Sequence, residues 1–157
     1  MPLQQQLRAL LDQEVENLQS LLDILTREYD SLARSDVASL EQGTALKNQA
    51  LSIQAGLASK RHHLVTTHLG SHSDKQLSEY VARSGDASLQ AAFSRLSELA
   101  EQCHDKNRSN GRLIAQKQAQ TRGALDILRH TDSSSATYSH SGKAATSEKS
   151  GRSLGKA

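Results

Sequence analysis

The chain has 157 residues, a hydrophobic fraction of 36% and only 3% aromatic residues, which leaves room for one domain whose core is built mainly from Leu and Ala. Such a core favours helices, because Leu and Ala lose little conformational freedom in a helix, and strand-forming residues are too scarce for a sheet. The net charge is +2, and four of the 19 basic and two of the 17 acidic residues follow residue 130. The rest of the chain is therefore neutral, which argues against a nucleic-acid-binding protein.

The cysteine content and the apolar runs bear on the compartment. Cys103 is the only cysteine of the sequence, so an internal disulfide framework is impossible and a reducing compartment is expected. The sequence has no apolar run of about 18 residues that could span a membrane. It also lacks the basic and apolar segments of a signal peptide. We therefore expect a cytoplasmic protein.

The first expected helix covers residues 7–32. Its apolar residues recur every three or four positions, which is the spacing of a coiled-coil seam. Polar residues fill the positions between them, so one side of this helix should be exposed. The seam consists of Leu7, Leu11, Val15, Leu18, Leu22, Leu25, Tyr29 and Leu32.

A second expected helix follows a short interruption at Ser35 and Asp36, two residue types that often cap the start of a helix. Because the connection is so short, the first two helices should be antiparallel neighbours. The apolar stripe of the second helix is Leu46, Ala50, Ile53, Leu57 and Leu64, with Lys60 as a polar exception.

The remaining helical pattern has two parts. Ser73 and Gln76 have the spacing of a capping box and predict a short helix, which should break or kink at residues 84–86. The longest pattern then extends from Leu89 to about Arg129. Its stripe is Leu89, Phe93, Leu96, Ala100, Cys103, Asn107, Asn110, Ile114, Lys117, Thr121, Ala124 and Leu128.

Residues 131–157 are rich in Ser, Thr and Gly and have almost no apolar anchor. Such a composition cannot bury enough surface to offset the entropy lost on ordering, so this segment should be a flexible tail. The predicted fold is thus all-α: an elongated antiparallel bundle of three to four long helices over residues 1–130, followed by the disordered tail.

Histidines and the cysteine are the candidates for chemistry. His62, His63, His68 and His72 lie close together in the sequence. Neighbouring His62 and His63 point apart on a helix, and Gly70 should break the helix before His72, so we expect no metal site. His104 follows Cys103, but adjacent helical side chains point about 100° apart, and Cys103 continues the apolar stripe. We expect a buried thiol, no catalytic site and no cofactor.

The last stripe changes character at Asn107 and Asn110, with Lys117 further on. One interpretation is that a buried Asn fixes the register of the helix at some loss of stability. The other is that this half of the helix is not permanently covered by its own bundle. Its apolar residues would then form a strip for an amphipathic partner helix, made of Leu113, Ile114, Leu125, Ile127 and Leu128.

Three features together resemble a known family. They are the Leu-rich antiparallel helix pair, the run Asn107–Gly111 with the pattern Asn-x-x-Asn-Gly, and Thr137-Tyr138 followed by Gly142. The arrangement resembles the FlgN-type flagellar export chaperones of bacteria over nearly the whole chain. Members commonly have Gly and Pro between the Tyr and the Gly, where this chain has residues 139–141, Ser-His-Ser.

The resemblance implies a cytoplasmic type III export chaperone. It would bind the C-terminal helical segments of hook-associated (hook-filament junction) proteins, prevent their premature assembly and deliver them to the export gate, its only contact with the membrane. The last helix and the segment after it would hold the partner, and Tyr138 would dock on the gate. The expected partner-binding residues are Asn107, Asn110, Leu113, Ile114, Lys117, Leu125, Leu128 and Tyr138.

Two other functions stay open at this stage. The seams over residues 7–32 and 89–103 could pair between chains as well as within one, which would make a structural coiled-coil or oligomerisation protein, or a homodimer of the chaperone. The basic tail could instead serve a helical protein that binds RNA or DNA, although the neutral body makes strong binding unexpected.

Overall fold

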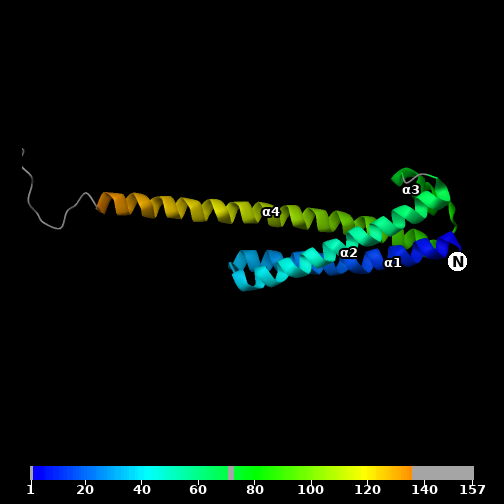
Figure 1. Ribbon diagram of the computed structural model, residues 1–157, viewed down its shortest axis with the longest axis horizontal. Coiled ribbons are helices and arrows are strands. Elements are labelled where there is room, and N and C mark those ends of the chain that lie inside the picture. Colours follow the sequence, from blue (N-terminus) through cyan, green and yellow to red (C-terminus); the bar gives the residue numbers. More distant parts are fainter. Residues whose placement is uncertain (1, 71–72, 136–157) are drawn as a thin grey trace, which may run out of the picture. The chain divides into compact units, whose positions relative to one another are not determined.

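The computed structural model describes residues 2–70 and 73–135. This part of the chain contains four helices and no strand: α1 (Leu3–Arg34), α2 (Val37–Leu69), α3 (Asp74–Arg83) and α4 (Ala87–Ser135) (Figure 1). The all-α prediction is confirmed. Helix α4 extends beyond its expected end near Arg129, so residues 131–135, assigned to the tail, are helical. The rest of the predicted tail lies outside the described residues. The chain forms two compact units, Met1–Lys117 and Gln118–Ala157.

The turn between α1 and α2 follows from its two residues. Ser35 adopts a left-handed conformation, with φ 56°, and its backbone N–H donates to the Leu32 carbonyl, which ends α1. The Asp36 carboxylate then accepts hydrogen bonds from the Ser39 hydroxyl (2.8 Å) and backbone N–H (3.1 Å) and so starts α2. These bonds hold the pKa of Asp36 below its ordinary value. The predicted interruption is confirmed.

Two further caps separate α2, α3 and α4. The Ser73 hydroxyl accepts a hydrogen bond from the Gln76 N–H (3.2 Å), as the capping-box pattern predicts. Gly85 has φ 67°, a conformation that glycine adopts without strain. The Asp86 carboxylate accepts from the backbone N–H groups of Ser88 (3.0 Å) and Leu89 (3.1 Å) and starts α4. Residues 84–86 thus form a complete break between two helices.

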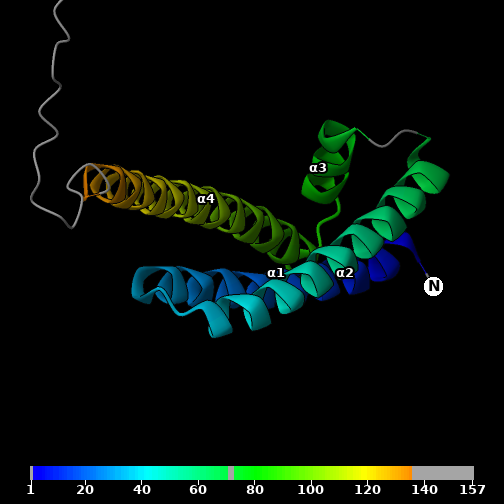
Figure 2. The same ribbon diagram turned by 60° about the vertical axis from the view of Figure 1, so that its left-hand side comes forward.

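Within residues 1–117, α1, α2 and the first part of α4 form an up-down-up bundle, and the short α3 connects α2 to α4 (Figures 1 and 2). Contacts between α1 and α2 join Glu14 to Arg61 and Glu28 to Lys47, so these helices are antiparallel as expected. Helices α1 and α4 are parallel, because later residues of α4 contact later residues of α1: Cys103 contacts Leu18, and Asn110 contacts Leu25. Lys117 contacts Ser35, just after the end of α1. The core consists of Leu7, Leu11, Leu18, Leu21, Leu25, Ala50, Val65, Leu77, Val81, Leu89, Leu96, Leu99 and Cys103.

The buried face of α1 differs from the predicted seam at several positions. Glu14 and Glu28 are buried, whereas Val15 is only partly buried and Tyr29 is exposed. A buried carboxylate is unfavourable unless it is paired and hydrogen-bonded. Both are paired here: Glu14 with Arg61 (2.6 Å) and Glu28 with Lys47 (3.3 Å). The apolar pattern alone was therefore wrong at these positions.

The stripe of α2 is confirmed only in part. Ala50 and Leu57 are buried, but Leu46 and Ile53 are exposed, and Val65 is the buried residue beside Leu64. The physical reason is that the positions facing α1 include three polar residues at heptad spacing, Lys47, Gln54 and Arg61, whose side chains contact the two buried glutamates or Asn17.

Candidate functional site

Asn110 joins α4 to α1. Its side chain is fully buried, and its Nδ2 donates to the Leu25 carbonyl (2.9 Å) and to Glu28 Oε1 (2.8 Å). Its Oδ1 has no hydrogen-bond partner among the described residues. A leucine here would bury more apolar surface, but it could not form these two bonds, which hold one alignment of the helices. The geometry therefore favours the register interpretation for Asn110.

Two lysines hold α4 against the end of α1. Lys106 Nζ lies 4.4 Å from the centre of the Tyr29 ring, a cation–π contact. Lys117 Nζ donates to Ser35 Oγ (3.1 Å), beside the last turn of α1. Lys117, expected to bind a partner, thus already contacts α1.

The other expected partner-binding residues of the unit Met1–Lys117 differ in solvent exposure. Asn107 is exposed, although the predicted stripe placed it on the bundle side of α4. Leu113 is half-buried, and Ile114 next to it is exposed. We call Leu113 and Ile114 the proximal patch.

A second apolar surface lies in the unit Gln118–Ala157. Leu125 is 48% exposed, Ile127 69% and Leu128 60%. We call these three residues the distal strip. Every described side chain from Gln118 to Ser133 is exposed, so none contributes to a core. Tyr138, the remaining expected residue, lies outside the described residues.

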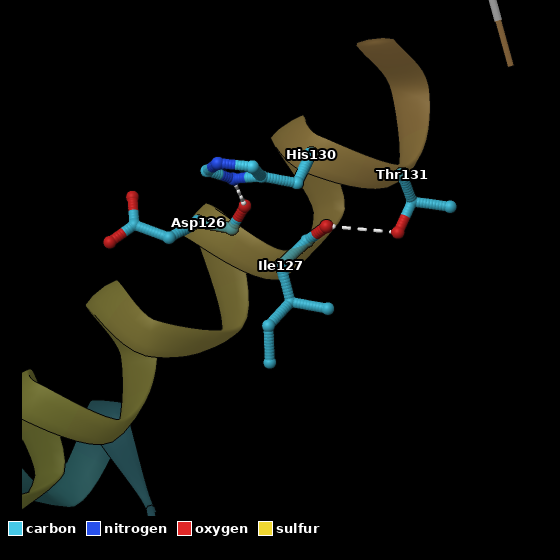
Figure 3. Close-up of a pocket in the computed structure, with 4 residues that line it drawn as sticks. All are labelled: Asp126, Ile127, His130 and Thr131. Carbon is cyan, nitrogen blue, oxygen red and sulfur yellow. Dashed lines mark hydrogen bonds between the residues drawn. The ribbon is translucent and has the colours of Figure 1, made fainter. Parts of the chain in front are cut away.

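Side chains around Ile127 show why this surface suits a protein partner better than a small ligand. In Figure 3, Ile127 points away from Asp126 and His130. His130 Nδ1 lies 2.8 Å from the Asp126 carbonyl, and Thr131 Oγ1 donates to the Ile127 carbonyl (2.9 Å). The hollow beside them is lined by residues of one helix alone. A small ligand needs a concave site that encloses most of its surface.

Helical propensity alone supports this part of α4 weakly. The first part of α4 provides the start of this helix, but most helical stability in proteins comes from packing an apolar face. From Gln118 to Ser133 the described side chains are all exposed, so this part of α4 has no apolar face packed against another helix. Covering the distal strip with another helix would both bury apolar surface and stabilise the helix that carries it.

Cys103 is a buried thiol, as expected. Its Sγ lies 3.4 Å from the Leu18 carbonyl, and burial raises the pKa of the thiol above its ordinary value. His104, the neighbouring residue, is exposed. The thiolate is the reactive form of cysteine, so both the raised pKa and the burial suppress its reactivity.

We expect Cys103 in the folded protein to react with an aromatic disulfide reagent at least about 100-fold more slowly than in urea, because reaction requires local opening. The change in absorbance of the reagent measures the rate. Ser109 is exposed on the same helix, so Ser109→Cys in a Cys103→Ser background should react at the unfolded rate. Equal rates for the two folded proteins would contradict the burial of Cys103.

Neither a metal-binding cluster nor a membrane-spanning helix occurs in the described part of the chain. Within residues 2–70 and 73–135, no group of three or more His, Cys, Asp or Glu side chains is placed to hold a metal ion; His72 lies outside these ranges. No helix of the described chain is long and apolar enough to cross a membrane.

The charge on α4 was missed by the sequence analysis. The segment from Lys106 to Leu125 contains five basic residues and no acidic one. The neutral total over residues 1–130 concealed this local excess. A count of charges along each helix would have revealed it.

Comparison with known proteins gives one result. The sequence model of a family described as FlgN protein matches residues 1–146, a range that contains all four helices. No curated protein and no solved structure gives a significant match.

Proposed function

The chain belongs to the FlgN family of flagellar export chaperones, and from this premise we propose that it binds the C-terminal helical segments of hook-filament junction proteins in the cytoplasm. The bound segment could not assemble prematurely, and the complex would deliver it to the export gate. The activity requires recognition and release of a helix and no bond chemistry.

The exposed distal strip is the observation that carries this proposal. Leu125 and Leu128 are three residues apart and therefore lie on the same side of the helix. An amphipathic helix from a partner can cover such a side with its own apolar residues, which is the common helix-in-groove mode of peptide recognition. Half-exposed leucines on an otherwise polar helix are surfaces of the kind that such partners bury.

The expected affinity is moderate. Covering the exposed parts of Leu125 and Leu128 contributes about 1 kcal/mol each, or roughly 2 kcal/mol in total, because Ile127 lies about 160° from Leu125 around the helix and is not covered from the same side. Association costs about 4–15 kcal/mol in lost freedom of motion. The distal strip alone is therefore insufficient, and we propose that the partner also contacts the proximal patch and Asn107. A binding free energy only slightly larger than the cost of association suits a chaperone, because the bound protein must be released for export.

Docking on the export gate is proposed through Tyr138, on the family resemblance alone. Asn110 and Lys117 are assigned a supporting role, because both side chains contact α1. They would keep the first part of α4 in place while the rest of the helix binds the partner.

A structural coiled-coil protein is the second candidate. Leu46 and Ile53 are exposed on α2, seven residues apart, which is the spacing that pairs helices between chains. Sedimentation equilibrium separates the two functions. A stable dimer that blocks client binding would favour the structural role, and a monomer would favour the chaperone.

Calorimetry with the full chain and the C-terminal segments of hook-junction proteins tests the proposal directly. We expect one segment per chain and a dissociation constant on the order of 1 µM. A chain ending after Lys117 should retain the helicity of α1–α3 and lose the binding. Absence of binding by the full chain to any junction-protein segment would remove the proposed function.

A further inference from the structure

Helix α2 carries little charge over much of its length. Residues 42–59 include one charged side chain, Lys47, although charged residues make up 23% of the sequence. The Lys47 Nζ lies 3.3 Å from both carboxylate oxygens of buried Glu28, so this charge is paired with α1. Every exposed residue of the segment 42–59 is uncharged. The exposed side of α1, in contrast, has acidic and basic residues from Asp12 to Arg34. The lack of charge is therefore a local feature of α2.

This uncharged surface also exposes large aliphatic side chains. Leu46, Leu51 and Ile53 are each about half exposed. Leu46 and Ile53 are seven residues apart and lie on the same side of α2, whereas Leu51 lies on another side. The core of a protein interface differs from the rest of a protein surface in being depleted of charged residues and more apolar. The side of α2 that carries Leu46 and Ile53 has this composition.

Residues at heptad spacing define the line along which a second helix packs. On this side of α2 they are Ser39, Leu46, Ile53 and Lys60, which we call the α2 seam. No carboxylate of the described chain forms an ion pair with Lys60. Parallel pairing of two copies would place Lys60 against Lys60 of the second copy, and two like charges in contact repel each other. Antiparallel pairing places Lys60 against Ser39 of the second copy, and Leu46 against Ile53. The position of Lys60 therefore favours the antiparallel arrangement.

Two hollows lie along the surface between α1 and α2, one beside each apolar residue of the α2 seam. The hollow beside Ile53 has a volume of about 340 Å³ and is also lined by Leu57 and Ser20. The hollow beside Leu46 has a volume of about 270 Å³ and reaches Gly43. Polar and charged residues of α1 complete both linings. In helix pairs each seam side chain fits between side chains of the facing helix. The antiparallel arrangement would direct Leu46 of one copy to the hollow beside Ile53 of the other.

We propose that α2 is the contact surface for a second copy of this chain, paired antiparallel through the α2 seam in a twofold-symmetric dimer. Twofold dimers are the most common soluble oligomers, and each copy presents the same surface to the other. Leu46 and Ile53 are then covered without burying a charge, because Lys60 at the end of the seam can keep its ammonium group in water. The interface contains no residue of the distal strip, so the proposal does not depend on the chaperone function.

Other partners fit this side of α2 less well. An anionic lipid surface attracts helices that are rich in Lys and Arg, and nucleic acid requires clustered basic residues. Residues 42–59 contain no basic residue other than Lys47, which is paired. A junction-protein helix has its own exposed apolar surface in the distal strip. A second copy of the chain is the partner whose surface lacks charge in the same place.

Sedimentation equilibrium of the full chain over about 1–300 µM measures the association. We expect a monomer–dimer equilibrium with a dissociation constant on the order of 10 µM, because the contact of one helix pair is small. Leu46→Asp/Ile53→Asp should raise this constant at least about 100-fold. Leu125→Asp/Leu128→Asp is the matched control with the same charge change, and it should leave the constant within about twofold of the wild type. Circular dichroism verifies that the three proteins are equally helical.

Disulfide crosslinking in a Cys103→Ser background tests the orientation of the two copies. Leu46→Cys and Ile53→Cys chains with different affinity tags are oxidised separately and as a mixture. Two cysteines form a disulfide only when their Cα atoms lie within about 7 Å. We expect a crosslink between the two kinds of chain and none between identical chains, because seven residues separate the two positions by about 10 Å along a helix.

The possible results separate the second copy from other partners. A wild type that stays monomeric at the highest concentration would overturn the proposal, and so would a dimer that Leu46→Asp/Ile53→Asp leaves unchanged. Crosslinks between identical chains alone would overturn the antiparallel pairing. A monomeric wild type that binds a junction-protein segment or phosphatidylglycerol vesicles through Leu46 and Ile53 would assign this surface to the junction protein or to a lipid surface. Failure of every junction segment to bind an intact dimer would remove the chaperone function and leave the dimer standing.

Discussion

Replacing Arg61 with methionine is expected to lower the free energy of unfolding by about 3 kcal/mol, because the substitution leaves the buried Glu14 carboxylate without its counter-ion. The Glu14 side chain is fully buried and lies 2.6 Å from Arg61 Nε. The estimate is at the low end for such losses, since Gln54 Nε2 still donates to the carboxylate (2.9 Å). Urea denaturation followed by circular dichroism measures the change.

Two further variants make this result interpretable. Arg8→Met removes a partner from an exposed pair, Arg8 with Asp12 at 3.5 Å, and should cost less than about 0.5 kcal/mol. Glu14→Leu/Arg61→Met should recover most of the lost stability, since a buried ion pair can often be replaced by apolar residues without a net loss. Equal effects of Arg61→Met and Arg8→Met would show that Glu14 is hydrated.

The two buried glutamates explain where the apolar pattern of α1 failed. A rule that places apolar residues inside treats Glu14 and Glu28 as surface residues and chooses Val15 and Tyr29 instead. The sequence did contain a compensating signal: Lys47, Gln54 and Arg61 are spaced by seven residues along α2. Linking those positions to Glu14 and Glu28 requires the antiparallel alignment of two helices, which periodicity within one helix does not contain.

In helix α4, too, the apolar periodicity of the sequence does not decide which residues are buried. Leu89, Leu96 and Cys103 are buried as predicted, and Asn110, whose burial was one of two interpretations, is buried as well. Between Leu96 and Cys103 the buried residue is Leu99, one position before the predicted Ala100, which is exposed, so the series is Leu96, Leu99, Cys103 in place of Leu96, Ala100, Cys103. Both series alternate by three and four residues, so only the position of α1 decides between them. Helix caps were predicted more accurately, because a cap depends on the few residues around it.

One of the two interpretations of the sequence left part of α4 uncovered, but the sequence could not locate where coverage ends. Whereas the long side chains of Arg95 and Lys106 reach residues 76 and 77 positions away, the hydrogen bonds of Cys103, Asn110 and Lys117 join α4 to residues of α1 and its cap that differ in number by 82 to 85. Because α1 ends at Arg34, this offset places the last covered position of α4 near Lys117. The limit is thus set by the length of another helix and by a register that Asn110 helps to fix.

Leu125→Asp/Leu128→Asp is expected to weaken binding of the junction-protein segment at least about 100-fold, which corresponds to about 2.7 kcal/mol, because it removes apolar surface from the interface and adds two charges that the partner must desolvate. Its melting temperature should stay within about 2 °C of the wild type, since neither leucine contributes to the core. Calorimetry and thermal denaturation measure the two quantities.

The matched control for this variant is Leu46→Asp/Ile53→Asp on α2, where the two side chains are 49% and 47% exposed, much like the 48% of Leu125. This control adds the same charge and removes a comparable apolar area. Any effect on binding that comes only from placing two charges on the surface should therefore appear in both variants. Binding within about twofold of the wild type is expected for the control. If the control lost binding as completely, the client would occupy the α1–α2 face, and the assignment to α4 would be wrong. A loss confined to the Leu125/Leu128 variant would place the client on the part of α4 that has no core of its own.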